Sequence, residues 1–189
     1  MIIRPSFIYV APLDKEILGH LEGIAENVRE QFGLEVKITE NQGPPDYALH
    51  EVRKQYNSSL IIKRLIEICP PDAVKILGVT SLDLFSPIFA YVFGEAQFRG
   101  KCAVVSSYRL RGNPGECNIN GVLQLTHRLE KEVIHELGHT FGLAHCADPD
   151  CVMNYSVGLQ SADRKFAYFC RACRETMIWH LATDLFLKV

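Results

Sequence analysis

Three histidines near residue 140 constrain this chain more than any other feature of its sequence. His135 and His139 are four residues apart, which places both imidazoles on one face of an α-helix, where they can bind one metal ion. Glu136 lies about 100° around that helix from His135, beside such an ion but not bound to it. His145 reaches the same ion only if the chain turns back, and Gly142 can take the positive φ that ends a helix. The spacing therefore predicts a helix, a turn and a three-histidine zinc site.

The same residues predict a catalytic zinc site. Three neutral imidazoles leave one coordination position open for water, which distinguishes a catalytic zinc site from a closed structural one. Zinc lowers the pKa of that water towards ~7, and Glu136 is placed to accept the proton and later deliver it to the leaving amine. The alternative, histidines on an ordinary amphipathic helix, is much less compatible with the full spacing. We therefore predict metal-assisted amide hydrolysis with Glu136 as the general base.

Four cysteines follow the histidines in two pairs, C-x4-C and C-x2-C, formed by Cys146, Cys151, Cys170 and Cys173. Pairs at such spacings supply four thiolates to a structural zinc ion. A nucleic-acid-binding ribbon uses similar ligands, but here the first cysteine directly follows His145 and the local charge is mixed. We therefore predict a second zinc ion that fastens the C-terminal helix to the catalytic segment, which makes two zinc ions per chain.

The histidine motif, followed by Met153, resembles that of the metzincin clan of zinc peptidases. The cysteine arrangement that continues to Cys173 resembles one branch of that clan, the archaemetzincins. The resemblance implies that Met153 packs beneath the three imidazoles without binding the metal. It also makes Tyr155 a candidate donor to the developing oxyanion, although a half-buried structural tyrosine is the commoner case. The motif covers residues 135–173, and the rest of the chain matches in length and element order.

The order of the elements predicts an α/β fold with a mixed, mostly parallel twisted sheet. Strands expected at residues 2–10, 34–39 and 73–79 alternate with two helices, which favours parallel pairing and right-handed crossovers. Residues 87–96 and 101–108 are expected to form a hairpin. The metzincin resemblance makes residues 88–95 the antiparallel edge strand that lines the cleft. A long helix over residues 121–141 then carries the zinc site, and a last helix spans residues 170–186.

Composition limits the partners of the chain. The net charge is −2 and the charged residues are interspersed, so we expect neither nucleic acid nor an anionic membrane as a partner. No apolar run approaches ~20 residues, so we expect no transmembrane helix. Without a signal peptide the protein is expected in the cytoplasm, where clustered cysteines bind metals rather than form disulfides. We expect a monomer with one domain over residues 1–189, divided into lobes of residues 1–142 and 143–189.

These observations lead to one main hypothesis, a zinc-dependent metallopeptidase that hydrolyses peptides. The first alternative is a zinc-binding structural or interaction protein without turnover, but zinc retention alone would not require Glu136. The second is a hydrolase of a non-peptide amide, which would use the same residues. Aminopeptidase action would need an acid to hold the free amine of the substrate, and the candidates are Asp83, Glu95 and Glu116. The remaining cysteines, expected to be free thiols, are Cys69, Cys102 and Cys117.

Overall fold

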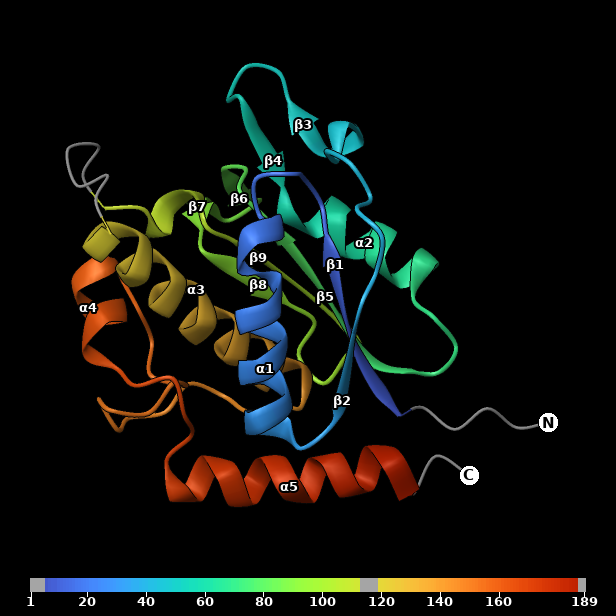
Figure 1. The fold of residues 1–189 in the computed structure, drawn as a ribbon, viewed down its shortest axis with the longest axis vertical. Helices are drawn as coiled ribbons and strands as arrows, with labels where there is room; N and C mark the ends of the chain where they lie inside the picture. Colours follow the sequence, from blue (N-terminus) through green and yellow to red (C-terminus); the bar gives the residue numbers. More distant parts are fainter. Residues whose placement is uncertain (1–5, 113–118, 187–189) are drawn as a thin grey trace.

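A five-stranded sheet forms the centre of the molecule (Figure 1). The computed structural model describes residues 6–112 and 119–186. The strand order is β2-β1-β5-β9-β8, in which β8 pairs antiparallel with β9 and the other pairs are parallel. The bounds are β1 Phe7–Pro12, β2 Glu35–Ile38, β5 Ala73–Thr80, β8 Gly94–Ala96 and β9 Cys102–Ser106. The predicted mixed sheet with an antiparallel edge strand is therefore confirmed.

Helices cover both faces of this sheet (Figure 1). Helices α1 (Leu21–Phe32) and α3 (Ile119–Thr140) pack on one face, and α2 (Ser58–Ile68) packs on the other. Strand β5 is buried along its whole length, with Leu77 in the cluster that includes α1 and α3 and Ile76 in the cluster that includes α2. This burial explains why the strand is nearly all apolar.

Local signals in the sequence account for the helix ends. The side chain of Asn57 accepts hydrogen bonds from the backbone N–H groups of Ser59 and Leu60 and so caps α2. Gly33 takes a φ of 66° and ends α1. The carboxylate of Asp14 accepts hydrogen bonds from the N–H groups of Glu16 and Ile17, and the chain then forms a short 3-10 turn, η1 (Leu18–His20), before α1.

A second, smaller sheet was not predicted. It has the order β3-β4-β6-β7, with bounds β3 Leu49–His50, β4 Gln55–Asn57, β6 Leu84–Ser86 and β7 Phe89–Val92. The strand predicted over residues 88–95 is divided at Phe93. Val92 pairs with Leu84 in the smaller sheet, whereas the Phe93 carbonyl accepts a hydrogen bond from the N–H of Ser106 in the larger one. The expected hairpin therefore consists of β8 and β9 alone.

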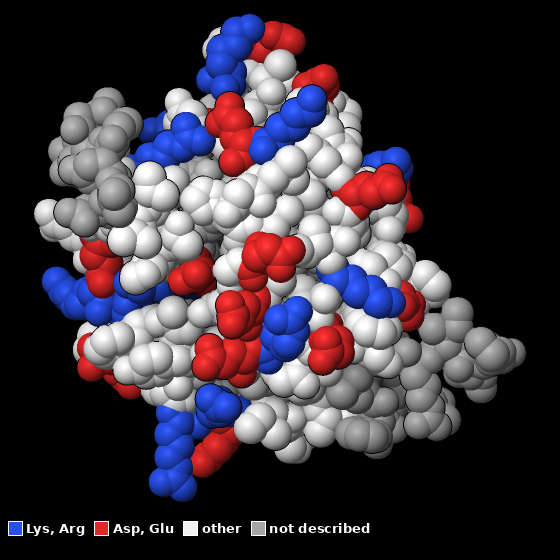
Figure 2. Space-filling view, viewed as in Figure 1, with Lys and Arg blue, Asp and Glu red and all other residues white. Residues whose placement is uncertain are grey.

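The C-terminal part of the chain contains two helices, α4 (Leu159–Arg164) and α5 (Arg171–Phe186). The last helix was predicted, whereas α4 was not. Charged side chains of both signs are mixed over the face shown in Figure 2, as the sequence led us to expect. Among the described residues, no helix has the length and apolar character needed to cross a membrane.

Candidate active site

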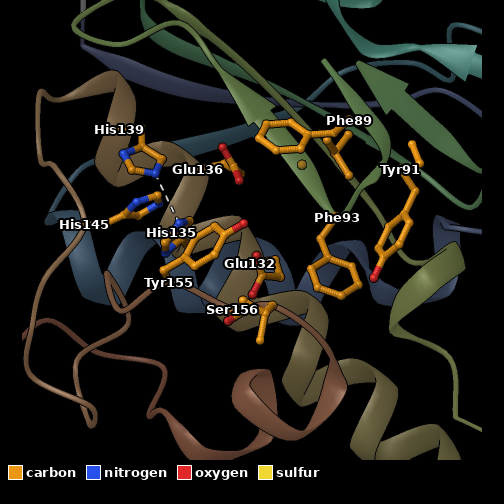
Figure 3. Close-up of a pocket in the computed structure, with 14 residues that line it drawn as sticks. Phe89, Tyr91, Phe93, Glu132, His135, Glu136, His139, His145, Tyr155 and Ser156 are labelled. Atoms are coloured by element: carbon orange, nitrogen blue, oxygen red, sulfur yellow. Dashed lines mark hydrogen bonds between the residues drawn. The ribbon is translucent and has the colours of Figure 1, made fainter. Parts of the chain in front are cut away.

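Helix α3 and the turn that follows it bring the three predicted histidines together (Figure 3). The helix ends at Thr140, and Gly142, with a φ of 87°, redirects the chain so that His145 returns to His135 and His139. One ring nitrogen from each histidine lies within 4.8 Å of the others, and the Nε2 atoms of His135 and His139 are 3.1 Å apart. The structure thus places all three imidazoles where one ion could contact them.

Backbone carbonyls fix the orientation of two of these rings. His135 Nδ1 lies 2.8 Å from the Val152 carbonyl oxygen, and His139 Nδ1 lies 2.7 Å from the Leu143 carbonyl oxygen. Because a carbonyl only accepts, each Nδ1 carries the proton and each Nε2 presents a lone pair. Two lone pairs 3.1 Å apart repel each other unless a cation lies between them. The donor set therefore fits zinc.

Burial keeps the histidines neutral. It is the main cause that lowers the pKa of His135 well below its usual value, and it also lowers the pKa values of His139 and His145. His135 is buried, His139 is half-buried and His145 is exposed. A neutral imidazole is the form that ligates a metal, so this environment suits the role predicted from the sequence.

Glu136 points into the same cavity from α3 (Figure 3). Burial, and secondly the neighbouring carboxylate of Glu132, raises the pKa of Glu136 well above its usual value, while Lys165 opposes this shift. On its other side Glu136 packs against the backbone of β8, because a Cβ at Gly94 would lie only 2.5 Å from Glu136 Cγ. Such a buried carboxylate is suited to proton transfer near neutral pH.

An ion pair that the sequence did not reveal lies one helical turn before His135. Lys165 Nζ is 3.0 Å from Glu132 Oε1, and the two side chains are 0% and 4% exposed. The same Nζ donates a hydrogen bond to the Asn154 carbonyl oxygen at 3.3 Å. Glu132 shares a helix face with Glu136, four residues away, which is a local signal, but no local pattern marks Lys165. The pair joins α3 to the segment after Met153.

Met153 and Tyr155 lie next to the histidines. Met153 is fully buried and packs on α3, since a Cβ at Gly138 would lie 2.5 Å from Met153 Sδ. The Tyr155 ring lies 4.9 Å from the His145 ring, lines the cavity and is 52% exposed. Both residues are thus near the site, as the resemblance implied.

The four predicted cysteines form a second cluster. The sulfurs of Cys146, Cys151, Cys170 and Cys173 lie within 4.8 Å of one another, and none of these residues is in a disulfide. Burial raises the pKa values of Cys151 and Cys173, whereas backbone N–H donation from Cys173 lowers the pKa of Cys170. Four convergent sulfurs fit a structural zinc ion. The backbone N–H of Cys146 donates to the Met153 carbonyl oxygen at 2.9 Å, which links the two clusters.

The other described residues singled out in the sequence do not line the cavity. Asp83 accepts two hydrogen bonds from Arg109, and Glu95 accepts from hydroxyl groups at the start of α2. Burial raises the pKa of the free thiol of Cys102 to about 12, so this thiol is unreactive. Cys69 is also free and is half-buried. Two remaining candidates, Glu116 and Cys117, fall outside the described residues.

A cavity of about 440 Å³ contains the histidine cluster. One side is formed by α3, the other by β7, β8 and Phe93 between them, and residues 155–157 complete the lining. This volume lies within the range typical of ligand pockets. The cavity therefore provides space for a substrate next to Glu136.

Comparison with known proteins agrees with this geometry. The model of peptidase family M54 matches residues 44–178, a range that contains both clusters. The chain belongs to peptidase family M54. Membership in M54 makes it a zinc metallopeptidase, and hence a hydrolase, as predicted.

Archaemetzincins are among the similar proteins. The archaemetzincin of Methanopyrus kandleri is 40% identical over 167 residues, covering 88% of this M54 chain and 89% of the relative. That of Archaeoglobus fulgidus is 36% identical over 167 residues, with coverages of 88% and 95%. The predicted resemblance to archaemetzincins is confirmed.

Solved structures share the M54 fold described above. The crystal structure of the M. kandleri archaemetzincin has a TM-score of 0.79 and 35% identity, covering 93% of this chain and 95% of that one. The crystal structure of the A. fulgidus archaemetzincin, complexed with malonate, has a TM-score of 0.76 and 34% identity, with coverages of 90% and 99%.

Proposed function

We propose that this zinc metallopeptidase holds its catalytic zinc with His135, His139 and His145 and uses Glu136 as the general base. The observation that carries the proposal is the convergence of the three imidazole nitrogens beside a buried carboxylate in one cavity. When bound, zinc supplies a Lewis acid that activates water and polarises the scissile carbonyl.

Glu136 would move the proton in this reaction. Its carboxylate accepts a proton from the attacking water and then donates it to the leaving amine. The raised pKa, caused chiefly by burial, supports this role because it makes the carboxylate a stronger base than an exposed glutamate. Contact with β8 at Gly94 supports a fixed position for the carboxylate.

Tyr155 is proposed to assist as a hydrogen-bond donor. Its ring is 4.9 Å from that of His145, and its half-exposed position leaves room for the side chain to move. A phenolic O–H at that place can donate to negative charge that develops on the substrate carbonyl oxygen. Met153, which is buried against Gly138, would support the histidines from below.

The cysteine cluster is proposed to hold a second, structural zinc ion. This proposal is supported by the convergence of four sulfurs from the two chain segments on either side of α4. The ion would fasten the start of α5 to the segment that carries His145. The division into lobes at residue 142, a cytoplasmic location and a monomeric state remain predictions from the sequence.

Peptides are the proposed substrates. Aminopeptidase action on short peptides is a narrower possibility that requires an acid to hold the substrate amine. Of the described candidates, Asp83 is engaged by Arg109 and Glu95 by Ser58 and Ser59, which weakens the case for either. A non-peptide amide remains a second substrate class for the same residues.

The test is digestion of a diverse peptide library by the wild type and by Glu136→Ala, both with measured zinc content and with products identified by mass spectrometry. We expect cleavage by the wild type alone, because the variant keeps its zinc ligands but loses the base. The product termini would show whether the enzyme removes terminal residues or cuts internally. Equal cleavage by the variant would exclude Glu136 as the base, and no cleavage by the zinc-loaded wild type would contradict peptidase action.

A further inference from the structure

Three aromatic side chains form the wall of the cavity opposite α3 (Figure 3). Phe89, Tyr91 and Phe93 alternate along β7 and the residue after it, so they project from the same face of the chain. Phe89 is 51% exposed and Tyr91 is 40% exposed. These rings therefore leave a large apolar surface open beside the histidines, and we call the three residues the aromatic wall.

Contacts with neighbouring side chains hold two of these rings, Tyr91 and Phe93, in place. The rings of Tyr91 and Phe93 meet edge to face with centroids 5.8 Å apart. The Arg109 guanidinium lies 4.9 Å from the centre of the Tyr91 ring and donates two hydrogen bonds to Asp83, of 2.8 and 2.6 Å. A surface fixed in this way loses little conformational entropy when it binds a ligand.

The carboxyl and imidazole groups of the cavity come from α3 and the segments that follow it, not from the aromatic wall. The carboxylates among its described lining residues are Glu132, which is paired with Lys165, and Glu136 beside the histidines. The lining includes no lysine or arginine among the described residues. An acidic substrate side chain placed against the aromatic wall would lose hydration without gaining a cationic partner, whereas an apolar one would be stabilised by burial.

We propose that the aromatic wall binds a bulky apolar side chain of the peptide substrate, aromatic or branched aliphatic, next to the scissile bond. This inference rests on the proposed function, because the peptide bond must lie at the histidines for its neighbouring side chain to reach the wall. Aromatic rings stack on or meet such a side chain edge to face and so add to the gain from burial.

The test uses two series of peptides that share one sequence with a single cleavable bond. In one series the residue before the bond is Phe, Leu, Ser or Asp, and in the other series the residue after the bond is varied in the same way. We expect kcat/KM to be about tenfold or more higher for Phe or Leu than for Ser on one of the two sides. In Phe89→Ala this ratio should fall towards one, and Phe89→Leu should retain most of it. Tyr47→Ala removes a ring that is 55% exposed but does not line the cavity, and it should keep the wild-type ratio.

Cleavage of all the peptides at similar rates, whichever side of the bond is varied, would overturn the inference, as would a Phe89→Ala variant that keeps the wild-type preference. Binding of the same peptides to zinc-loaded Glu136→Gln, measured by calorimetry, separates this outcome from failure of the proposed function. The Phe peptide should bind about tenfold more tightly than the Ser peptide, and less so when Phe89→Ala is added. Selective binding without cleavage by the wild type would refute peptidase action and keep the aromatic wall. Cleavage without selectivity would support peptidase action and refute the role of the aromatic wall.

Discussion

At Gly94 the backbone of β8 comes so close to the Glu136 side chain that a residue with a Cβ does not fit at this position without displacing its neighbours. A Cβ at this position would lie 2.5 Å from Glu136 Cγ and 2.8 Å from the Val104 carbonyl oxygen. The carbonyl belongs to the paired strand β9 and cannot move away, so the glutamate would have to shift. The position of the proposed base thus depends on a residue that has no functional group.

We expect Gly94→Ala to lower kcat/KM by about a hundredfold, because a displacement of roughly 1 Å is enough to spoil a catalytic geometry. Zinc content should not change, since the three atoms nearest to the added Cβ belong to Glu136 and Val104 and not to a histidine. Gly19→Ala is the control, because a Cβ there meets nothing within 4 Å. Steady-state kinetics and metal analysis check the prediction, and wild-type turnover in Gly94→Ala would contradict it.

Lys165 supports the site through charge. We expect Lys165→Met to lower the free energy of unfolding by about 3–5 kcal/mol, because it leaves the Glu132 carboxylate buried without its partner at 3.0 Å. Denaturant unfolding of the zinc-loaded protein measures this loss. Adding Glu132→Leu should recover part of it. A double variant in which the two losses simply add would show that the pair is not coupled.

At the scale of elements, α4 is attached to α3 by a doubly hydrogen-bonded ion pair. Arg128 Nε and Nη2 each lie 2.6 Å from an oxygen of Asp163. These bonds hold the pKa of Asp163 below its usual value. A carboxyl whose pKa is lowered by folding stabilises the protein above its unfolded pKa, about 3.9, and this contribution disappears as the pH falls through the folded pKa.

We therefore expect Asp163→Asn to destabilise the protein by about 1 kcal/mol at pH 7, a value reduced for the partial exposure of the carboxylate. The difference from the wild type should shrink below about pH 4. Urea unfolding at several pH values measures both. Glu67→Gln, which removes an exposed pair with Arg64, serves as the control and should change stability by less than about 0.5 kcal/mol. A difference that stays constant down to acid pH would contradict the assignment.

Elements with local signals could be predicted and those without could not. Helix α2 has its cap at Asn57, and α1 has its terminating glycine at Gly33, so both followed from the sequence. The break between β7 and β8 depends on pairing with β6 and β9, which lie elsewhere in the chain. Helix α4 has only six residues, too few for a periodic pattern to indicate a helix. It is held by the contact of Asp163 with Arg128, which is distant in the sequence.

The same distinction holds for the candidate site. The histidine and cysteine clusters were predictable because the members of each are closely spaced along the chain, at intervals typical of metal-binding motifs. The roles of Gly94 and Lys165 could not be predicted, because each depends on a partner more than thirty residues away in the chain. Gly94 contacts Glu136, and Lys165 pairs with Glu132. The residues of the aromatic wall lie in the strand predicted over residues 88–95. Which of its side chains face the cavity could not be predicted, because this depends on the division of that strand at Phe93.

At the scale of the whole molecule, the two clusters should behave as separate metal sites. We expect about two zinc ions per chain by elemental mass spectrometry. His139→Ala should lose one ion and keep the circular dichroism spectrum of the wild type. Cys170→Ser should lose the other with a less stable fold, because the cysteines fasten α5. A folded wild type that binds one ion in excess zinc would contradict this prediction.

The position of β7 at the edge of the smaller sheet affects how the protein associates with other copies in solution. In the described part of the chain this strand has a strand neighbour only on the β6 side, and Ile88 and Phe89 next to its start are 82% and 51% exposed. An open apolar edge of this kind is a template on which a second copy can add a strand. Phe89 also lines the cavity, so part of the surface that would contact a peptide could bind a second copy instead. Crowding should promote self-association there, and a peptide that occupies the cleft should keep the molecules dispersed.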